Sequence, residues 1–332
     1  MAAREHRVPY GADFLRRLLE LPTAAPVDVS ADGETLLVAC DRPGTAQLHR
    51  LPARGGELEH LTYLPEPVDG MFVPGSGRVL IATDEGGNER MQLHLLDARS
   101  HAEPEPLVVD PRFIHREPCI SRDGSALAYA TNRRNGRDFD VVVRSLETGA
   151  ERCVYDGGGS VDPAGFSPDG RRLALVHEND ERSGANDVLL VDLHDGAIVH
   201  ATLHDDAAYV GPPAWLADGS AFFAPTSIGR DTTAIGRYDL AAQTWDVVLA
   251  SRWDLDCALD EAGRTLFIQH GANDPRVPLG EAEQIHRALT EKGIRRELVV
   301  YRDEGHSIAK LENRIDTFLR AAAFLDDVVG RA

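Results

Sequence analysis

The stretch SPDGRRLALV (residues 167–176) joins a turn that ends in Gly, here Asp-Gly, to an apolar run, and a turn ending in Gly before an apolar run recurs along the chain. Asp and Gly tolerate the positive φ of tight turns, and a run such as LALV has the length and apolarity of a buried strand. Related stretches are SADGETLLVA (30–39), VPGSGRVLIA (73–82), SRDGSALAYA (121–130), LADGSAFFAP (216–225) and DEAGRTLFIQ (260–269). Their turn glycines, Gly33, Gly77, Gly124, Gly170, Gly219 and Gly263, are 44, 47, 46, 49 and 44 residues apart.

Between these turns lie pairs of strands joined by a polar or Gly-containing turn, as in residues 141–154, 187–200 and 234–248. Three or four short strands in each unit of about 45 residues are typical of a β-propeller blade. A helical solenoid would need a 3.6-residue apolar period, and a β-sandwich would show no such long repeat. The sequence therefore predicts a mainly β fold, an incomplete or irregular propeller of about five blades plus one strand.

Three regions follow from this pattern. Residues 1–29 form a lead-in with a short amphipathic helix over 11–22, and residues 30–265 form the blades. Residues 266–332 form a third region, in which strands alternate with helices. The W-L-A-D-G and F-S-P-D-G turns resemble the blade repeats of the TolB and dipeptidyl-peptidase class.

The charge of the chain argues against two classes of partner. Lys and Arg total 35 against 54 Asp and Glu, a net charge of −19, so nucleic acid and anionic membranes would repel the protein. The N-terminal stretch has no apolar signal region, and no apolar run is long enough to span a bilayer. We therefore expect a cytoplasmic protein.

No cofactor or metal is expected. Cys40, Cys119, Cys153 and Cys257 are widely spaced and contain no C-x-x-C pair, so they are expected to be reduced thiols. The histidines near residues 194–206, which are His194, His200 and His204 beside Asp205 and Asp206, lack the spacing of a helical metal site.

The pattern changes after residue 265. HGANDPRVP (270–278) is a loop, 280–293 an amphipathic helix, 296–301 a strand, DEGHSIAK (303–310) a second loop, and 313–328 a second helix. This order of strand, loop, helix, strand, loop and helix predicts a parallel sheet with helices packed on it.

These residues carry a resemblance to a known family. The stretches LFIQHGANDPRVPLGEAEQIHRAL (266–289) and YRDEGHSIAKLENRIDTFLRAAAFL (301–325) resemble the C-terminal end of the prolyl oligopeptidase family of serine peptidases. Members of this family, among them acylaminoacyl and dipeptidyl peptidases, have a β-propeller followed by an α/β-hydrolase domain. The resemblance implies hydrolysis of short peptides or aminoacyl derivatives.

By motif position, the resemblance assigns two members of a Ser-Asp-His triad to Asp274 and His306. A carboxylate on one imidazole nitrogen fixes the tautomer and stabilises the imidazolium, while the other nitrogen takes a proton from the nucleophile. Both residues follow the ends of consecutive strands, where parallel sheets build their sites.

The nucleophile is missing from the pattern. A hydrolase elbow, G-x-S-x-G, should precede Asp274, and the sequence contains none. Ser160 and Ser220 are expected to be turn residues of the propeller. Ser307 has small neighbours, but no histidine follows it and the family usually has Gly there, so it is interpreted as a substitution beside His306 and kept as the alternative nucleophile.

Whether the chain is an enzyme therefore stays open. It resembles a family member shortened by an internal deletion that removes the elbow and the oxyanion-hole segment, a possible pseudoenzyme that we expect to be inactive alone. A partner chain or a second copy is expected to cover the remnant of the hydrolase sheet. The alternatives are a non-catalytic propeller that binds peptides or proteins, and a remnant without a function of its own.

Overall fold

The computed structural model describes most of the chain. The described residues are 22–99, 103–178, 182, 184–250, 265–274, 278–291, 295–304, 310, 313, 316–317, 320–321 and 323–324. The helix expected over 11–22 lies outside this set, apart from its last residue, and so do His306, Ser307 and Cys257. The chain divides into two compact units, Met1–Phe166 and Ser167–Ala332.

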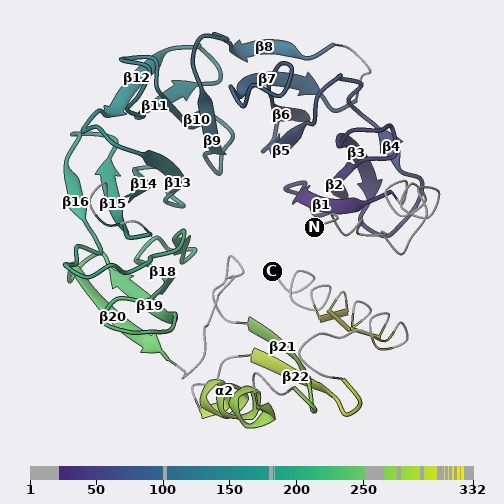
Figure 1. Ribbon diagram of the computed structural model, residues 1–332, viewed down its shortest axis with the longest axis vertical. Helices are drawn as coiled ribbons and strands as arrows, with labels where there is room; N and C mark the ends of the chain where they lie inside the picture. The colour runs from purple at the N-terminus through teal and green to yellow at the C-terminus, as the bar shows by residue number, and fades with distance from the viewer. Residues whose placement is uncertain are drawn as a thin grey trace, which may run out of the picture. The chain divides into compact units, whose positions relative to one another are not determined.

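The first unit contains three four-stranded antiparallel sheets, in which each strand pairs with the next in the chain (Figure 1). The first sheet consists of β1 (Ala24–Val29), β2 (Thr35–Cys40), β3 (Gln47–Pro52) and β4 (Glu59–His60). The second consists of β5 (Asp69–Val73), β6 (Arg78–Thr83), β7 (Gln92–Asp97) and β8 (Glu105–Val108). The third consists of β9 (His115–Ile120), β10 (Ala126–Thr131), β11 (Asp140–Ser145) and β12 (Glu151–Tyr155).

Two more sheets of the same kind follow. The fourth has the order β13 (Val161–Phe166), β14 (Arg172–Glu178), β15 (Asn186–Asp192) and β16 (Ile198–His200), and the unit boundary falls after β13. The fifth consists of β17 (Ala214–Trp215), β18 (Ala221–Thr226), β19 (Ala234–Asp239) and β20 (Thr244–Leu249). Five four-stranded meanders confirm the prediction of a mainly β fold with about five propeller blades.

The Asp-Gly stretch forms the turn between the first and second strands of a sheet. In SPDG, Oγ of Ser167 donates to Oδ1 of Asp169 at 2.6 Å, and the Gly170 N–H donates to the Ser167 carbonyl at 2.8 Å. Gly170 has φ +68°, a conformation that glycine adopts without strain. The apolar run that follows is the second strand, with Leu173 and Leu175 fully buried. The first strand precedes the turn, so β1 lies within the stretch expected as a lead-in.

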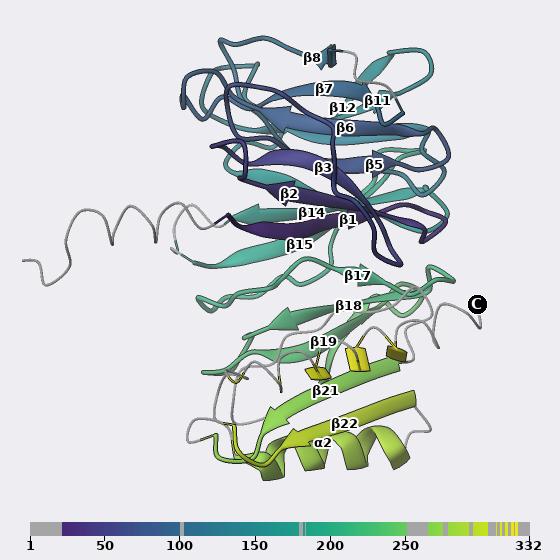
Figure 2. The ribbon, with the colours of Figure 1, turned by 90° about the vertical axis from the view of Figure 1, so that its right-hand side faces the viewer.

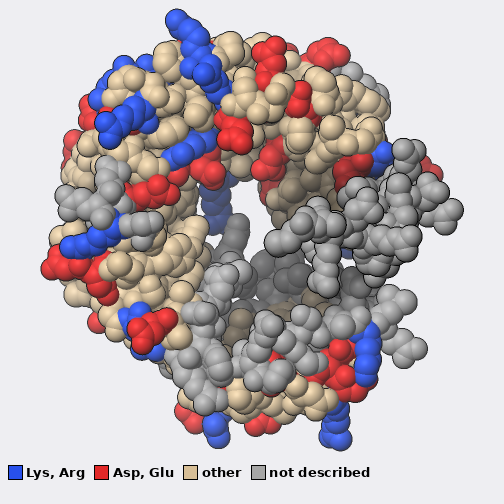
Figure 3. Space-filling model, viewed as in Figure 1, with Lys and Arg blue, Asp and Glu red and all other residues tan. Residues whose placement is uncertain are grey.

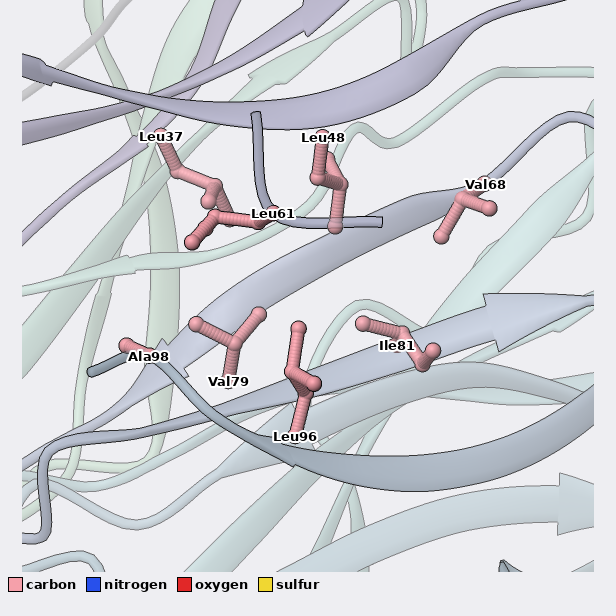
Figure 4. Close-up of a cluster of buried hydrophobic side chains, with 8 residues drawn as sticks. All are labelled: Leu37, Leu48, Leu61, Val68, Val79, Ile81, Leu96 and Ala98. Atoms are coloured by element: carbon pink, nitrogen blue, oxygen red, sulfur yellow. The ribbon is translucent and has the colours of Figure 1, made fainter. Parts of the chain in front are cut away.

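Apolar side chains from neighbouring sheets interdigitate to form the cores. Between the first two sheets, Leu37, Leu48 and Leu61 face residues of the second sheet such as Val79 and Ile81 (Figure 4). Each fully buried side chain of this size stabilises the fold by about 1.5–3 kcal/mol. A similar cluster joins the second and third sheets. These contacts stack successive sheets of the first unit like the blades of a propeller.

The sixth repeat of the sequence pattern, DEAGRTLFIQ (260–269), differs from the other five in how its apolar run pairs. Its apolar run is β21 (Thr265–Gly271), which pairs in parallel with β22 (Arg295–Tyr301). The helix α2 (Leu279–Glu291) connects these two strands, whereas a hairpin follows the second strand of each blade. The single strand expected to follow the fifth blade therefore belongs to the predicted parallel sheet.

Candidate functional site

The candidate site lies where the two parallel strands end together. Gly271 is in register with Tyr301, so the loop that begins at Ala272 and the loop that begins at Arg302 leave the same edge of the sheet. Helix α2 covers one face of the sheet, and the described helical residues 313, 316–317, 320–321 and 323–324 lie on the other side (Figures 1 and 2). The predicted βαβα arrangement is thus present.

The second helical segment is tied to the sheet by several contacts. The Tyr301 hydroxyl donates to Oδ2 of Asp316 at 3.0 Å, and Nε2 of Gln269 donates to the Thr317 carbonyl at 3.3 Å. The rings of Phe267 and Phe324 pack with their centroids 5.1 Å apart. These contacts join the two strands from which the loops leave to the second helical segment.

The two loops are hydrogen-bonded to each other. The Ala272 N–H donates to the Tyr301 carbonyl at 2.8 Å, and the Asn273 N–H donates to the Glu304 carbonyl at 2.9 Å. The Asn273 side chain donates to the Arg302 carbonyl at 2.9 Å. Asp274 follows directly, half-buried, with its N–H donating to the Gly271 carbonyl at 3.1 Å. The structure therefore places Asp274 next to residues that bond to the 301–304 segment, which precedes His306 in the sequence.

The second loop begins with a buried carboxylate, that of Glu304. Glu304 is only 4% exposed, and its Oε1 accepts hydrogen bonds from the Lys310 N–H at 2.9 Å and from Nδ2 of Asn313 at 2.7 Å. Asp303 forms an ion pair with the Lys310 ammonium. His306 and Ser307 lie outside the described residues, so their assignment stays a prediction. Glu304, Asn273 and Asn313 were missed by the sequence reasoning, and the only signal was the acidic residue before the Gly-His pair.

The other serines considered as nucleophiles lie in the propeller sheets. Oγ of Ser160 accepts a hydrogen bond from Arg116 at 2.8 Å, just before β13. Oγ of Ser220 donates to Asp218 at 2.7 Å in the turn before β18. Both are turn residues, as predicted.

The histidines near residue 204 also have structural contacts. Nδ1 of His204 lies 2.7 Å from the Thr202 carbonyl and 3.1 Å from Oδ1 of Asp187, and Nε2 lies 3.2 Å from the Ala208 carbonyl. Among the described residues, no group of three or more His, Cys, Asp or Glu side chains could hold a metal ion. Cys40, Cys119 and Cys153 are free thiols, and burial raises the pKa of Cys119 to about 12.

The surface carries charges of both signs. On the face shown in Figure 3, acidic and basic side chains are interspersed over the described residues, without a continuous basic patch. Within the described part of the chain, no helix has the length and apolarity needed to cross a membrane.

Comparison with known proteins gives a family match and two curated relatives. Residues 253–332 match the prolyl oligopeptidase family. A 119-residue segment is 30% identical to dipeptidyl peptidase family member 6 of Caenorhabditis elegans, and covers 36% of this chain and 15% of that protein. A 54-residue segment is 44% identical to dipeptidyl aminopeptidase BIII of Pseudoxanthomonas mexicana, and covers 16% of this chain and 8% of that protein. The matches thus span only a small part of either relative.

Solved structures show the same fold at low sequence identity. A candidate TolB from Agrobacterium tumefaciens superposes with a TM-score of 0.50 at 20% identity, over 69% of this chain and 80% of that one. A puromycin-hydrolyzing peptidase of Mycobacterium tuberculosis superposes with a TM-score of 0.52 at 12% identity, over 77% of this chain and 48% of that one. Both structures agree with the prediction of TolB-like propeller blades. The predicted resemblance of the C-terminal segment to the prolyl oligopeptidase family is confirmed over residues 253–332.

Proposed function

We propose that this chain derives from serine peptidases of the prolyl oligopeptidase type and retains the proton-relay pair, Asp274 and His306, without the nucleophile. The observation that carries this proposal is the set of hydrogen bonds between the Asp274 loop and residues 301–304 at one edge of a parallel sheet. Both loops lie within residues 253–332, the segment that matches the prolyl oligopeptidase family.

The chemistry of such a pair is limited without a partner hydroxyl. Asp274 would orient and stabilise the His306 imidazole, which would accept a proton from a nucleophile and return it to the leaving group. Because the sequence has no G-x-S-x-G elbow, neither the attacking oxygen nor the adjacent oxyanion hole is supplied by such a motif. Hydrolysis by this chain alone is therefore not expected, and a second polypeptide or copy would cover the exposed edge of the two-stranded sheet.

The substrate class follows from the relatives. Two are dipeptidyl peptidases by name, and one structural neighbour is a puromycin-hydrolyzing peptidase. Short peptides and aminoacyl derivatives are therefore the substrates to test, in a cytoplasmic setting.

The test is a hydrolysis assay with dipeptidyl and aminoacyl p-nitroanilides. We expect no release of p-nitroaniline by the wild-type chain above that of His306→Ala. Turnover by the wild type that is lost in both Asp274→Asn and His306→Ala would show a complete active site and contradict the proposed lack of a nucleophile.

A second candidate is a propeller that binds peptides without cleaving them. It is favoured by the contrast between five complete four-stranded sheets and a parallel sheet of two strands. It predicts saturable binding of fluorescent peptides, measured by anisotropy, that is unchanged in Asp274→Asn. Weakened binding in that variant would assign the peptide to the relay site.

A further inference from the structure

A cavity of about 360 Å³ in the first unit is lined by residues of the second and third sheets. Leu107 in β8 and Val109 directly after this strand contribute apolar side chains. The third sheet and its loops contribute His115, Arg133, Arg144 and Glu151. The cavity is distant in sequence from the relay pair, and its residues have no part in the proposed function.

The polar wall is organised around Glu151. Its carboxylate accepts hydrogen bonds from Arg133 at 2.9 Å, from Arg144 at 2.8 Å and from the Tyr129 hydroxyl at 3.0 Å. Burial opposes ionisation of Glu151, but these hydrogen bonds outweigh burial and lower its pKa. Glu151 is therefore ionised at neutral pH and holds both guanidinium groups in place.

The charged residues that line the cavity are two arginines, Arg133 and Arg144, and two carboxylates, Asp110 and Glu151. Asp110, which also lines the cavity, is paired with Arg112 through hydrogen bonds of 2.9 and 2.7 Å. Arg112, which does not line the cavity, adds a third positive charge beside Asp110, in a chain whose net charge is −19. His115 adds no charge at neutral pH, because burial and the nearby Arg133 lower its pKa to about 4.

Polar atoms in this wall lack partners. His115 is only 1% exposed, and neither of its ring nitrogens has a hydrogen-bond partner among the described residues. The same holds for Nε of Arg144 within that set. A buried polar atom without a partner costs about 1–3 kcal/mol, so a ligand that satisfies these atoms gains by that amount.

We propose that this cavity binds a small organic monoanion, a carboxylate held by Arg144 and the His115 ring, with its apolar body against Leu107 and Val109. Arg112 pairs with Asp110, so the ligand's negative charge would face the two guanidinium groups that share Glu151. A carboxylate accepts hydrogen bonds from a guanidinium N–H and from an imidazole N–H at once. The apolar residues at the end of β8 favour a short alkyl chain over a fully hydrated ion.

Saturation-transfer NMR on the full chain tests this proposal with butyrate as the probe. Butyramide, which has nearly the same shape without the charge, is the matched neutral probe, and inorganic phosphate is the multivalent one. We expect butyrate to bind at least about tenfold more tightly than either, because charge-assisted hydrogen bonds contribute about 1.5–3 kcal/mol. Equal binding of butyramide, tighter binding of phosphate, or no binding of butyrate would overturn the proposal.

Two variants locate the bound probe. His115→Phe keeps a ring against Tyr129, now 5.9 Å away between centroids, and removes both nitrogens. Arg144→Gln removes a charge, and each variant is expected to weaken butyrate binding at least about tenfold. The control is Arg78→Gln, which breaks the exposed ion pair with Glu105 elsewhere in the unit. If binding survives in His115→Phe with an unchanged melting temperature, or falls equally in the control, the assignment is wrong.

Discussion

Replacing Gly124 by Ala tests how the third sheet packs on the second. Gly124 has φ +71°, and a Cβ atom at this position would lie 2.2 Å from the Pro74 carbonyl oxygen. Gly33 is the matched control, since it occupies the same S-x-D-G turn with φ +72°, and a Cβ atom there would have no other atom within 4 Å. The two turns share their hydrogen bonds, including a Gly N–H to Ser carbonyl bond of 2.8 Å in each.

The expected loss of stability follows from these contacts. Alanine in the left-handed region costs about 1–2 kcal/mol, and this cost applies to both variants. Gly124→Ala must also move a backbone carbonyl, and overpacking of this kind costs about 1–3 kcal/mol more. For a unit of this size, each kcal/mol lowers the melting temperature by about 2–4 °C.

Thermal and urea unfolding of both variants, followed by circular dichroism, measure the difference. We expect Gly33→Ala to lower the free energy of unfolding by about 1–2 kcal/mol and Gly124→Ala by about 2–5 kcal/mol. Equal losses would refute the close approach of the third sheet to Pro74. No loss in Gly33→Ala would refute the conformational argument for both turns.

Three further predictions concern single contacts. Glu304→Ala is expected to lower the free energy of unfolding by about 1–3 kcal/mol and to speed hydrogen exchange at the Lys310 amide. Glu304→Gln keeps an oxygen that can accept both hydrogen bonds and should lose much less stability, so equal losses in the two variants would mean that these hydrogen bonds do not stabilise the chain. Arg116→Lys is expected to cost about 2 kcal/mol, because Arg116 makes two hydrogen bonds to Asp162 and lies 3.7 Å over the Phe139 ring, while Arg78→Lys at an exposed pair should change stability by less than about 0.5 kcal/mol in the same urea titration. Hydrogen bonds from Ser121 and from the Ser125 N–H and hydroxyl lower the pKa of Asp123 to about 2, so its contribution is present above the unfolded pKa of about 4 and is lost as pH falls toward 2; Asp123→Asn should therefore show a shallower fall of melting temperature over that range, and an unchanged slope would contradict this.

Much of the fold could be predicted because its signal is local. Each Asp-Gly turn precedes a strand whose apolar run is buried on both sides, and the repeat length of about 45 residues separates blades from sandwich hairpins. The first strands of the sheets carry a weaker signal: AAPVDV in β1 is largely exposed, so its sequence indicates a lead-in rather than a blade strand. Likewise, the apolar run of β21 resembles a blade strand, and only its parallel pairing distinguishes it.

The polar contacts within the first unit and at the candidate site were harder to predict than the strands. The Arg116–Asp162 pair joins residues 46 positions apart, and no local pattern distinguishes these two charges from others on the surface. In the sequence, Glu304 of the D-E-G-H loop resembles an ordinary loop acid, and its burial depends on Asn313 from the following helix. Long-range polar partners of this kind are set by tertiary packing rather than by periodicity.

The measurement that tests the central claim most directly is fluorophosphonate labelling followed by intact mass spectrometry. The wild-type chain is compared with His306→Ala and Ser307→Ala, each shown to be folded by a cooperative melting transition. We predict no phosphonyl adduct on any of the three proteins, because the relay pair has no nucleophile to activate. A stoichiometric adduct on the wild type that is lost in both variants would identify Ser307 as a working nucleophile and contradict the account.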